Sequence, residues 1–232
     1  MAELSPLFTP FRLKGLDLPN RFVMPAMQRG MCEDGKPSAA LAAYYRRRAQ
    51  GGVKLIVGES AAVDHPTATR QPTSARITAA TRDAWAHCVE EVGQEGGHML
   101  IQLWHEGAVR KDDGLSIGPS GLVQPGRPNG RAASAAELGE LVEAYARSAL
   151  VAQDAGAAGV EVHAAHGYLL DQFLWAGTNL REDGYGGPDI RHRARLPAEI
   201  VTAIRAACGA DFVISLRFSQ WKEVDYSARI AA

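Results

Sequence analysis

The sequence predicts an α/β fold in which short strands alternate with longer helices. Five apolar segments have the length of strands, and the four segments between them carry helix-end signals. The strand segments are apolar almost throughout, which is typical of parallel strands buried on both faces. Parallel strands joined by helices form right-handed βαβ units. Such units build either a (β/α)8 barrel or an open doubly wound sheet.

The expected elements follow one another in a regular order along the chain. We expect strands at Arg21–Pro25, Val53–Val57, Met99–Leu103, Gly159–His163 and Phe212–Arg217. We expect helices at Ala39–Gln50, Thr81–Glu95, Ser134–Ala155 and Arg191–Cys208. A serine or threonine begins each of the first three helices and a glycine follows all four, as is usual at helix ends. A hairpin that turns at Lys14–Gly15 precedes the first strand.

Two observations favour the barrel over the open sheet. An open nucleotide-binding sheet usually has a G-x-G-x-x-G motif or a P-loop after its first strand, and this chain has neither. Polar residues gather where the strands end, and barrel enzymes build their active sites at the carboxyl ends of the strands. These polar residues are Gln28, Glu59, Gln102, His105, His163, His166 and Arg217. The prediction is therefore a (β/α)8 barrel, also called a TIM barrel.

Five strands are fewer than a closed barrel requires. A (β/α)8 barrel takes about 250 residues, whereas this chain has 232 and spends many of them on the long loops 105–133 and 174–190. We expect residues 1–232 to form a single barrel domain with about five of the eight strands, ending near the helix after the fifth strand. A longer polypeptide or a second chain would complete the barrel, since an unclosed parallel sheet has edges that pair or aggregate.

The composition argues against several classes of protein. Lys plus Arg is 25 and Asp plus Glu is 26, and this balance gives no basic surface for nucleic acid or anionic membranes. No apolar run approaches the roughly 18 residues of a membrane span. The start, MAELSPLF, has no apolar stretch typical of a secretion signal. Cys32, Cys88 and Cys208 lack metal-ligand or C-x-x-C spacing, which indicates a reduced, cytoplasmic compartment.

The segment that starts at Val160 is the richest in reactive side chains. His163 ends a strand, His166 follows three residues later, and Tyr168 follows two beyond that. Their N–H and O–H donors could hold a carbonyl oxygen in a strand-end pocket and deliver a proton to its substrate. The spacing alone leaves two alternatives, a metal site and a pair of histidines that only stabilise a loop. No third residue has the spacing of a metal ligand, so no metal is expected.

Longer motifs resemble the Old Yellow Enzyme family of FMN-dependent ene-reductases. HAAHGYLLDQFL and TNLREDGYGG resemble the family's sequence after the fourth strand, and LFTPFRLKGLDLPNRFVMPAM is similar to its opening hairpin and first strand. IVGESAAV, MLIQLWHEG and LRFSQW resemble its second, third and fifth strands, and GPSGL the loop after the third. The resemblance covers the whole chain, which corresponds to about the first two thirds of the family barrel. It implies a (β/α)8 fold, FMN, and reduction of the C=C bond of α,β-unsaturated carbonyl compounds by NAD(P)H through flavin N5.

The resemblance also implies which residues contact the flavin. Pro25, Ala26 and Met27 would pack against the flavin ring at the end of the first strand. Ser60 would lie beside the pyrimidine side of the ring, and Gln102 would hydrogen-bond a ring carbonyl and a ring nitrogen. Glutamine suits this position because its side-chain amide is both a donor and an acceptor.

Further residues would act on the flavin and on the substrate. Arg217 would lie near flavin N1 and O2, where a permanent positive charge stabilises the anionic reduced ring. Gln28 stands where the family usually has a threonine or cysteine that tunes the flavin potential. His163 and His166 would bind the carbonyl oxygen of the substrate, and Tyr168 would protonate the carbon next to that carbonyl.

Two other functions stay open at the level of sequence. A catalytically incompetent barrel fragment or assembly module would lack the FMN phosphate site, because such barrels hold phosphate in the loops after strands seven and eight. A metal-dependent barrel hydrolase would use His163 and His166 instead. The expected partner is a small enone-type molecule, with neither nucleic acid nor membrane. A homo-oligomer or a complementing chain is the expected protein partner.

Overall fold

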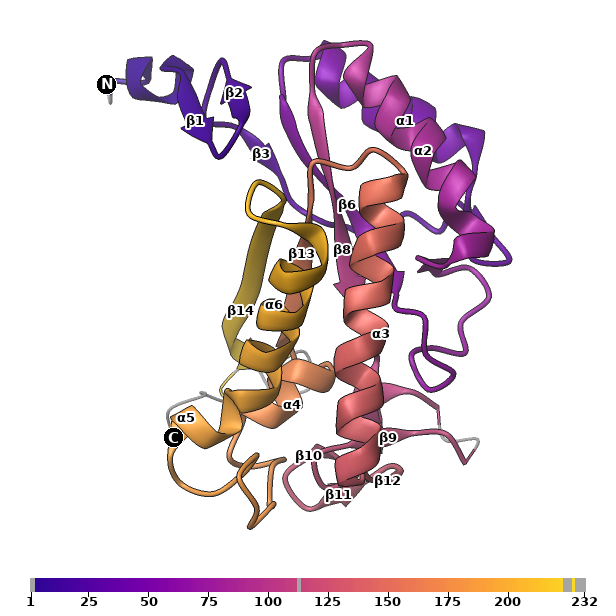
Figure 1. Ribbon diagram of the computed structural model, residues 1–232, viewed down its shortest axis with the longest axis vertical. Helices are drawn as coiled ribbons and strands as arrows, with labels where there is room; N and C mark the ends of the chain where they lie inside the picture. The colour runs from indigo at the N-terminus through magenta and orange to yellow at the C-terminus, as the bar shows by residue number, and fades with distance from the viewer. Residues whose placement is uncertain (1–2, 112–113, 223–226, 228–232) are drawn as a thin grey trace.

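The computed structural model describes residues 3–111, 114–222 and 227. Its main sheet contains five parallel strands in the spatial order β14-β13-β8-β6-β3 (Figure 1). The strands are β3 (Val23–Met24), β6 (Leu55–Ala62), β8 (His98–Trp104), β13 (Gly159–His166) and β14 (Val213–Lys222). A short strand, β7 (Ala75–Arg76), pairs with the end of β6. All five expected strands are thus present, and neighbours in sequence are neighbours in space, as consecutive βαβ units require.

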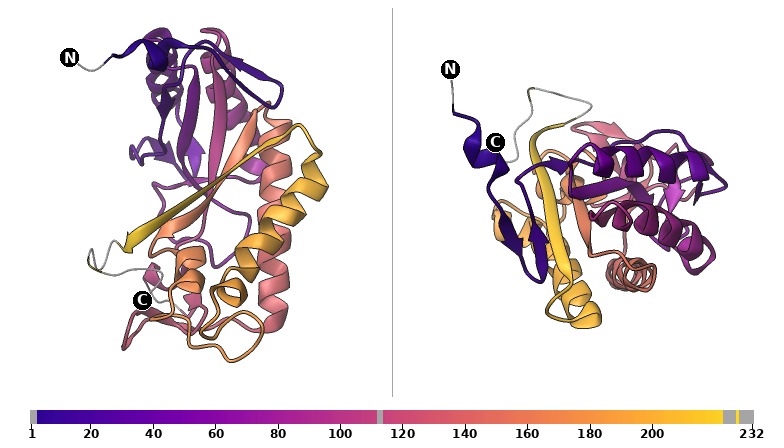
Figure 2. Two further views of the ribbon diagram at one scale, coloured as in Figure 1. Left: turned by 90° about the vertical axis from the view of Figure 1, so that its left-hand side faces the viewer. Right: turned by 90° about the horizontal axis from the view of Figure 1, so that it is seen from above.

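Helices connect these strands and pack against one face of the sheet. They are α1 (Ala39–Gln50), α2 (Arg82–Gly93), α3 (Ala135–Asp154) and α6 (Arg195–Cys208), with the shorter α4 (Leu169–Leu174) and α5 (Ile190–Arg193). Figure 2 shows α3 and α6 next to one another on the same side of the strands. Ser134 and Glu137 close the capping box at the start of α3, as predicted. None of the described helices combines the length and the apolar character needed to cross a membrane.

The two faces of the sheet bury different groups of residues. The helix-facing side carries Ile56, Met99, Ile101, Val160 and Val162, which belong to the larger core. The opposite side carries Leu55, Val57, Leu100 and Val213, which pack with Leu18 in a smaller core. Leu18 belongs to the predicted hairpin, formed by β1 (Phe11–Leu13) and β2 (Leu16–Leu18). The hairpin therefore covers one end of the inner face, and the other end stays open for polar side chains.

Three strands extend further than their apolar runs predict. β6, β13 and β14 continue through polar residues to Ala62, His166 and Lys222, because backbone pairing with their neighbours persists there. The first strand is shorter than expected, since only Val23 and Met24 pair with β6. The helix expected after the fifth strand falls on residues 223–232, which apart from Ser227 lie outside the described residues.

The loops contain short strand pairs that the sequence analysis does not predict. Strands β4 (Cys32–Glu33) and β5 (Lys36–Pro37) form a hairpin, in which Asp34 and Gly35 both have positive φ. This turn geometry favours Asp-Gly, so the dipeptide is the signal for the hairpin. The loop after β8 contains η3 (Gly107–Val109) and four strands of two or three residues. They are β9 (Ile117–Gly118), β10 (Leu122–Gln124), β11 (Arg127–Pro128) and β12 (Arg131–Ala132).

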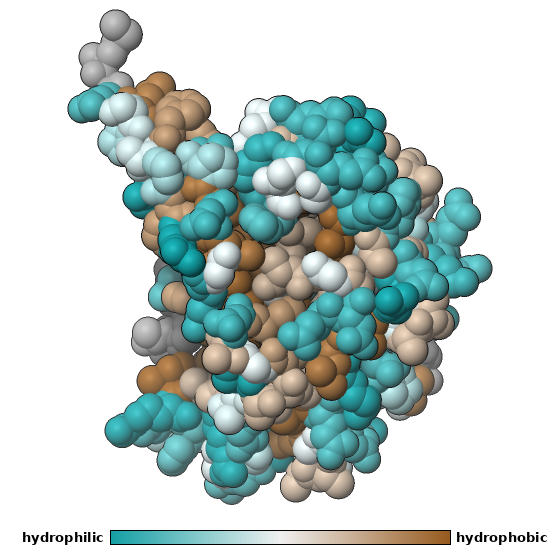
Figure 3. All heavy atoms as spheres, turned by 45° about the horizontal axis from the view of Figure 1, so that its top comes forward, coloured by the Kyte–Doolittle hydropathy of each residue, from teal (hydrophilic) through white to brown (hydrophobic). Residues whose placement is uncertain are grey.

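Large apolar side chains are exposed at the β14 edge of the sheet and on the N-terminal segment. Leu216 and Phe218 on the outer face of β14 are 47% and 62% exposed. They line an apolar groove of about 590 Å³ together with Val201 and Pro197 of α6. The second surface lies on the N-terminal segment, where Phe8 is 64% exposed. Figure 3 shows apolar residues on this segment, which projects at the upper left.

A buried ion pair joins the end of β14 to α4. The Lys222 ammonium lies 2.8 Å from a carboxylate oxygen of Asp171, and both side chains are fully buried. The Gly167 amide donates a hydrogen bond of 2.6 Å to the other carboxylate oxygen. Burial raises the pKa of Asp171, although Lys222 and the Gly167 amide act in the opposite direction. The pair thus fixes the end of β14 against the segment that follows β13.

Replacing Lys222 with methionine should strongly destabilise the protein. The Lys222→Met variant leaves the Asp171 carboxylate buried without its cation, which typically costs about 3–5 kcal/mol. Urea unfolding measures this change. The control is Glu143→Gln, which breaks the exposed Arg147–Glu143 pair and should change the free energy of unfolding by less than about 1 kcal/mol. Equal losses in the two variants would contradict the importance given to the buried pair.

Candidate functional site

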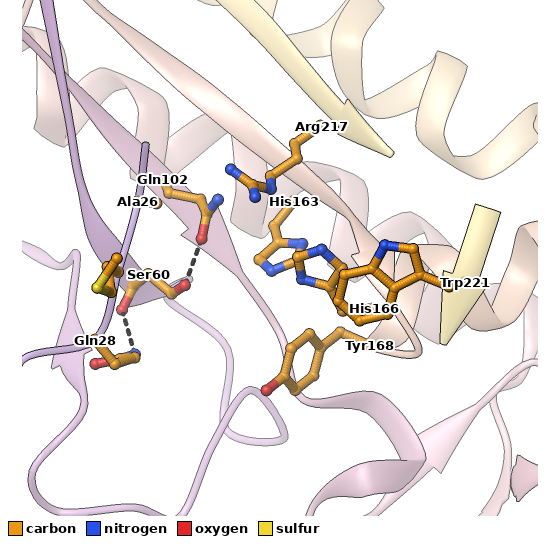
Figure 4. Close-up of a pocket in the computed structure, with 10 residues that line it drawn as sticks. Ala26, Gln28, Ser60, Gln102, His163, His166, Tyr168, Arg217 and Trp221 are labelled. Carbon is orange, nitrogen blue, oxygen red and sulfur yellow. Dashed lines mark hydrogen bonds between the residues drawn. The ribbon is translucent and has the colours of Figure 1, made fainter. Parts of the chain in front are cut away.

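A cavity of about 280 Å³ opens at the carboxyl ends of the parallel strands (Figure 4). Its lining residues are Ala26, Met27, Gln28, Ser60, Gln102, His163, His166, Tyr168, Arg217 and Trp221. Nine of the ten predicted site residues therefore lie together, although they come from five different segments of the chain. Pro25 is exposed and does not line the cavity. Trp221 lines it and was not predicted as a site residue.

A row of hydrogen-bonded side chains crosses four strands beneath the cavity. Ser60, Gln102, Glu161 and Ser215 stand at paired positions of β6, β8, β13 and β14. The Ser60 hydroxyl donates to Gln102 Oε1, and Gln102 Nε2 donates to Glu161 Oε1 at 2.7 Å. The Ser215 hydroxyl donates to Glu161 Oε2 at 3.1 Å. We call these four residues the polar ladder.

Sequence reasoning missed two members of the polar ladder. Glu161 and Ser215 each stand two residues before a predicted site residue, namely His163 and Arg217. Residues two apart on a strand point to the same face, so this spacing was the available signal. The same rule places Trp221 on the inner face, four residues after Arg217.

Two of the polar residues at strand ends do not face the cavity. Glu59 is fully buried beside Ser60 and holds the loop after β3, accepting from the Arg29 amide at 2.9 Å and from the Cys32 thiol at 3.0 Å. Burial raises the pKa of the Glu59 carboxyl. The pairing of β6 with β8 shifts register between Gly58 and Ser60, so Glu59 has no paired residue on β8, whereas Ser60 pairs with Gln102. Glu59 therefore positions the neighbouring cavity loop without entering the cavity.

His105 is the second such residue. Its ring is 1% exposed and lies 2.8 Å from the Thr67 hydroxyl through Nε2. Its Nδ1 accepts the Gly107 amide at 2.9 Å, so both ring nitrogens have partners within the fold. Burial lowers the pKa of His105 to about 3, with smaller contributions from His65 and Arg110. His105 thus stabilises the loop after β8.

His163 is a neutral hydrogen-bond donor toward the cavity. Its side chain is only 4% exposed, and its Nδ1 accepts the Ala165 amide at 3.3 Å. A neutral imidazole carries one proton, so acceptance at Nδ1 places that proton on Nε2. Burial, with smaller contributions from the neighbouring His166 and Arg217, lowers the pKa of His163 to about 3. The ring is therefore neutral at pH 7.

His166 is held in an unusual backbone conformation. Its φ is +65°, which side chains other than glycine adopt rarely. Its amide donates to the Ser219 hydroxyl at 3.0 Å, and its ring stacks on Trp221 with centroids 4.4 Å apart. Burial lowers its pKa, with Arg217 and Lys222 acting in the same direction. Strand β14 thus supplies both the wall and the hydrogen bond that orient His166.

Tyr168 completes a cluster of three rings. The Tyr168 and His163 centroids are 5.2 Å apart, and the His163 and His166 centroids are 5.3 Å apart. Trp104 meets Tyr168 edge-on at 5.3 Å. Figure 4 shows the two imidazoles and the phenol grouped on one side of the cavity. Several N–H and O–H donors therefore converge on one small volume.

Arg217 supplies positive charge to the same cavity. Its side chain is half-buried, and it stands opposite His163 in the pairing of β13 with β14. Within residues 3–111 and 114–222, no carboxylate forms an ion pair with it. A half-buried guanidinium without a counter-ion favours a ligand that is or becomes negatively charged. No cluster of three or more His, Cys, Asp or Glu side chains within the same ranges could hold a metal ion.

Comparisons with known proteins identify the family. The sequence model of the NADH:flavin oxidoreductase / NADH oxidase family matches residues 6–231. The chain belongs to this family. The 12-oxophytodienoate reductase 7 of Oryza sativa subsp. japonica is 35% identical over 229 residues, covering 90% of this chain and 57% of that protein. The NADH oxidase of Thermoanaerobacter brockii is 34% identical over 231 residues, covering 94% of this chain and 35% of that protein.

Solved structures of relatives have the same fold. Morphinone reductase in complex with tetrahydroNAD has a TM-score of 0.84 and 34% identity, over 92% of this chain and 64% of that one. Old Yellow Enzyme from Pichia sp. AKU4542 has a TM-score of 0.87 and 29% identity, over 97% of this chain and 64% of that one. The predicted Old Yellow Enzyme family and the predicted incomplete barrel are confirmed. The family cofactor is FMN, with NADH or NADPH as electron donor.

Loss of the His163 ring should flatten the pH dependence of stability. An unfolded histidine has a pKa of about 6.5, whereas that of folded His163 is about 3. Between these values only the unfolded chain binds the proton, so each such histidine lowers the free energy of unfolding by about 1.4 kcal/mol per pH unit as the pH falls. Above pH 6.5 neither the folded nor the unfolded chain binds this proton, so His163 no longer makes the free energy of unfolding depend on pH.

The test is urea unfolding of the unsubstituted chain and of His163→Asn between pH 7 and pH 4. The free energy of unfolding should fall less steeply with falling pH in His163→Asn, by about 1.4 kcal/mol per pH unit, the contribution of one proton. His87→Asn, a change at an exposed position of α2, is the control and should leave the slope as it is. An unaltered slope in His163→Asn would rule out a buried neutral ring.

Proposed function

We propose that this chain binds the FMN ring in the cavity and contributes to the NAD(P)H-dependent reduction of α,β-unsaturated carbonyl compounds. The observation that carries the proposal is the convergence of an amide, a guanidinium and three rings with N–H or O–H donors on one cavity. These groups lie in a chain of a flavin oxidoreductase family. When bound, FMN supplies hydride transfer from NAD(P)H to the C=C bond.

The cavity residues fit the chemistry of a flavin ring. Its pyrimidine edge has carbonyl acceptors beside an N–H donor, and Gln102 offers both complementary groups. Arg217 would stabilise the negative charge that the ring gains on reduction. Ala26 and Met27 line the same cavity with apolar atoms suited to the flat face of the ring. Gln28, held by its bond of 3.1 Å to the Ser60 carbonyl, would bring a second amide to the ring.

The three rings at the other side of the cavity suit an enone. His163 Nε2–H and His166 would donate to the carbonyl oxygen, which withdraws electrons from the C=C bond. Both imidazoles stay neutral at pH 7 because burial lowers their pKa values, and a neutral ring retains one N–H donor. A phenol is protonated at neutral pH, so Tyr168 could deliver a proton to the carbon beside the carbonyl.

An assembly module without catalytic competence is the second candidate function. The apolar groove beside Leu216 and Phe218 favours it, because an outer strand face in a (β/α)8 barrel is normally covered by helices. The relatives are longer, and the chain spans 57% of the rice reductase. The occupant of the groove would be a further βα unit of the barrel, from a longer cytoplasmic polypeptide or from a complementing chain. Homo-oligomerisation would cover the same surface in another way.

The first experiment is a visible absorption spectrum of the purified chain after incubation with FMN and desalting. A retained flavin band that bleaches with dithionite is the expected result. Lumiflavin, which has the ring without the ribityl phosphate, tests the ring cavity separately. Gln102→Ala is the matched variant and should weaken binding of both flavins by about tenfold, the worth of one or two hydrogen bonds. A chain that binds neither flavin would contradict the proposal and favour the assembly module.

Tyr168→Phe should slow one half of the reaction only. Removal of the phenol proton should reduce the rate at which the flavin is reoxidised by an enone by about 10²–10⁴-fold, the usual worth of a general acid. Reduction of the flavin by NAD(P)H should keep its rate, since no proton from Tyr168 is needed there. Stopped-flow absorbance separates the two halves. Tyr185→Phe, which removes a phenol bonded to Glu199 away from the cavity, is the control.

Equal slowing of both halves in Tyr168→Phe would exclude Tyr168 as the proton donor. Slowing of reoxidation in Tyr185→Phe to the same degree would attribute the effect to general loss of structure.

A further inference from the structure

The polar ladder uses both ends of the Gln102 amide from opposite sides. Ser60 lies on β6 and Glu161 on β13, the two strands that flank β8. An amide oxygen has two lone pairs and an amide nitrogen two protons. Ser60 occupies one lone pair of Oε1, and Glu161 occupies one proton of Nε2. Among the described residues, one lone pair of Oε1 and one proton of Nε2 therefore have no further partner.

Glu161 determines which end of this amide is the nitrogen. A carboxylate is an acceptor only, so it can pair with Nε2 but repels Oε1. A reversed Gln102 would place two acceptors against each other at a side chain that is 2% exposed, where an unpaired polar atom is costly. Ser60 does not determine the orientation of the Gln102 amide, because its hydroxyl can donate to Oε1 or accept from Nε2 equally well.

The carboxylate of Glu161 is itself held in place. Its second oxygen accepts the Ser215 hydroxyl at 3.1 Å, and the side chain is 8% exposed. The direction of the Gln102 amide is thus set by a carboxylate that does not line the cavity.

We propose that Glu161 is a positioning residue that gives the cavity a fixed order of hydrogen-bonding groups. Figure 4 shows the nitrogen of the Gln102 amide on the side of Arg217 and its oxygen on the side of Ser60. The remaining N–H would therefore lie nearer to Arg217 and the remaining lone pair nearer to Ser60. This order suits a planar ring with a carbonyl on the arginine side and an adjacent N–H, which is the imide edge of a flavin. The choice of ligand rests on the proposed function, whereas the control of Gln102 by Glu161 does not.

The test is a double-mutant cycle with lumiflavin as the probe. Glu161→Gln keeps the shape of the side chain but can donate as well as accept, so it allows both directions of Gln102. Lumiflavin should bind about tenfold more weakly to Glu161→Gln, as measured by fluorescence quenching. The same substitution should have no effect in the Gln102→Ala background, because no amide remains to be oriented. Ser215→Ala should give a smaller loss than Glu161→Gln, and Glu143→Gln should give none.

A second readout needs no flavin. In the NMR spectrum of the unliganded chain, one side-chain N–H proton of Gln102 should exchange slowly with solvent, and Glu161→Gln should abolish this protection. The same loss of lumiflavin affinity with and without the Gln102 amide would overturn the inference, as would unchanged exchange of the Gln102 protons. An unsubstituted chain that binds no lumiflavin but shows the protected proton would contradict the flavin function and leave the role of Glu161 standing.

Discussion

The arrangement of the site depends on one constraint, the in-register pairing of parallel strands. Side chains alternate between the two faces of each strand, so paired residues of neighbouring strands point into the same layer. Gln102, Glu161 and Ser215 meet because the hydrogen-bond pattern aligns them, although the last is 113 positions after the first. The apolar layer of Leu100 and Val213 lies one step below them, and the cavity lies above.

The chemical character of this site comes from the burial of its histidines next to a positive charge. His163 is kept neutral because it lies in a dry layer beside Arg217, whose positive charge opposes protonation. The same position makes His163 a donor of defined direction, since its other nitrogen is occupied by the Ala165 amide. A cavity with neutral donors on one side and a guanidinium on another is suited to electron-rich atoms, and no carboxylate is among its lining residues in the described part of the chain. Glu161, the carboxylate of the polar ladder, does not line the cavity.

The sequence predicts the strands well because their apolar runs are long and their helices have clear ends. It predicts nine of the cavity residues because they lie in motifs that resemble a known family. For Glu161, Ser215 and Trp221 the spacing along their own strands indicates only the face to which they point. Their contacts with Gln102 and His166 depend on which strands are neighbours, and a single-strand pattern does not contain that information. The Lys222–Asp171 pair is not predicted because it joins the end of β14 to helix α4 across 51 positions of the sequence. The hairpin at Asp34–Gly35 had a local signal in its turn residues, whereas the exposure of Pro25 depends on how short β3 is.

The polar ladder also bears on how the strands find their partners during folding. A strand that slipped by one position would turn its inner residues outward, so apolar burial already opposes that error. A slip of two positions leaves each side chain on the same face of the sheet, so apolar burial does not oppose it. Such a slip of β14 would set Val213 or Arg217 opposite Glu161 in place of Ser215. Val213 has no side-chain donor for the Glu161 carboxylate, and Arg217 in that place would leave its position opposite His163. The polar ladder thus favours the correct register of each strand. The same register places Arg217 opposite His163.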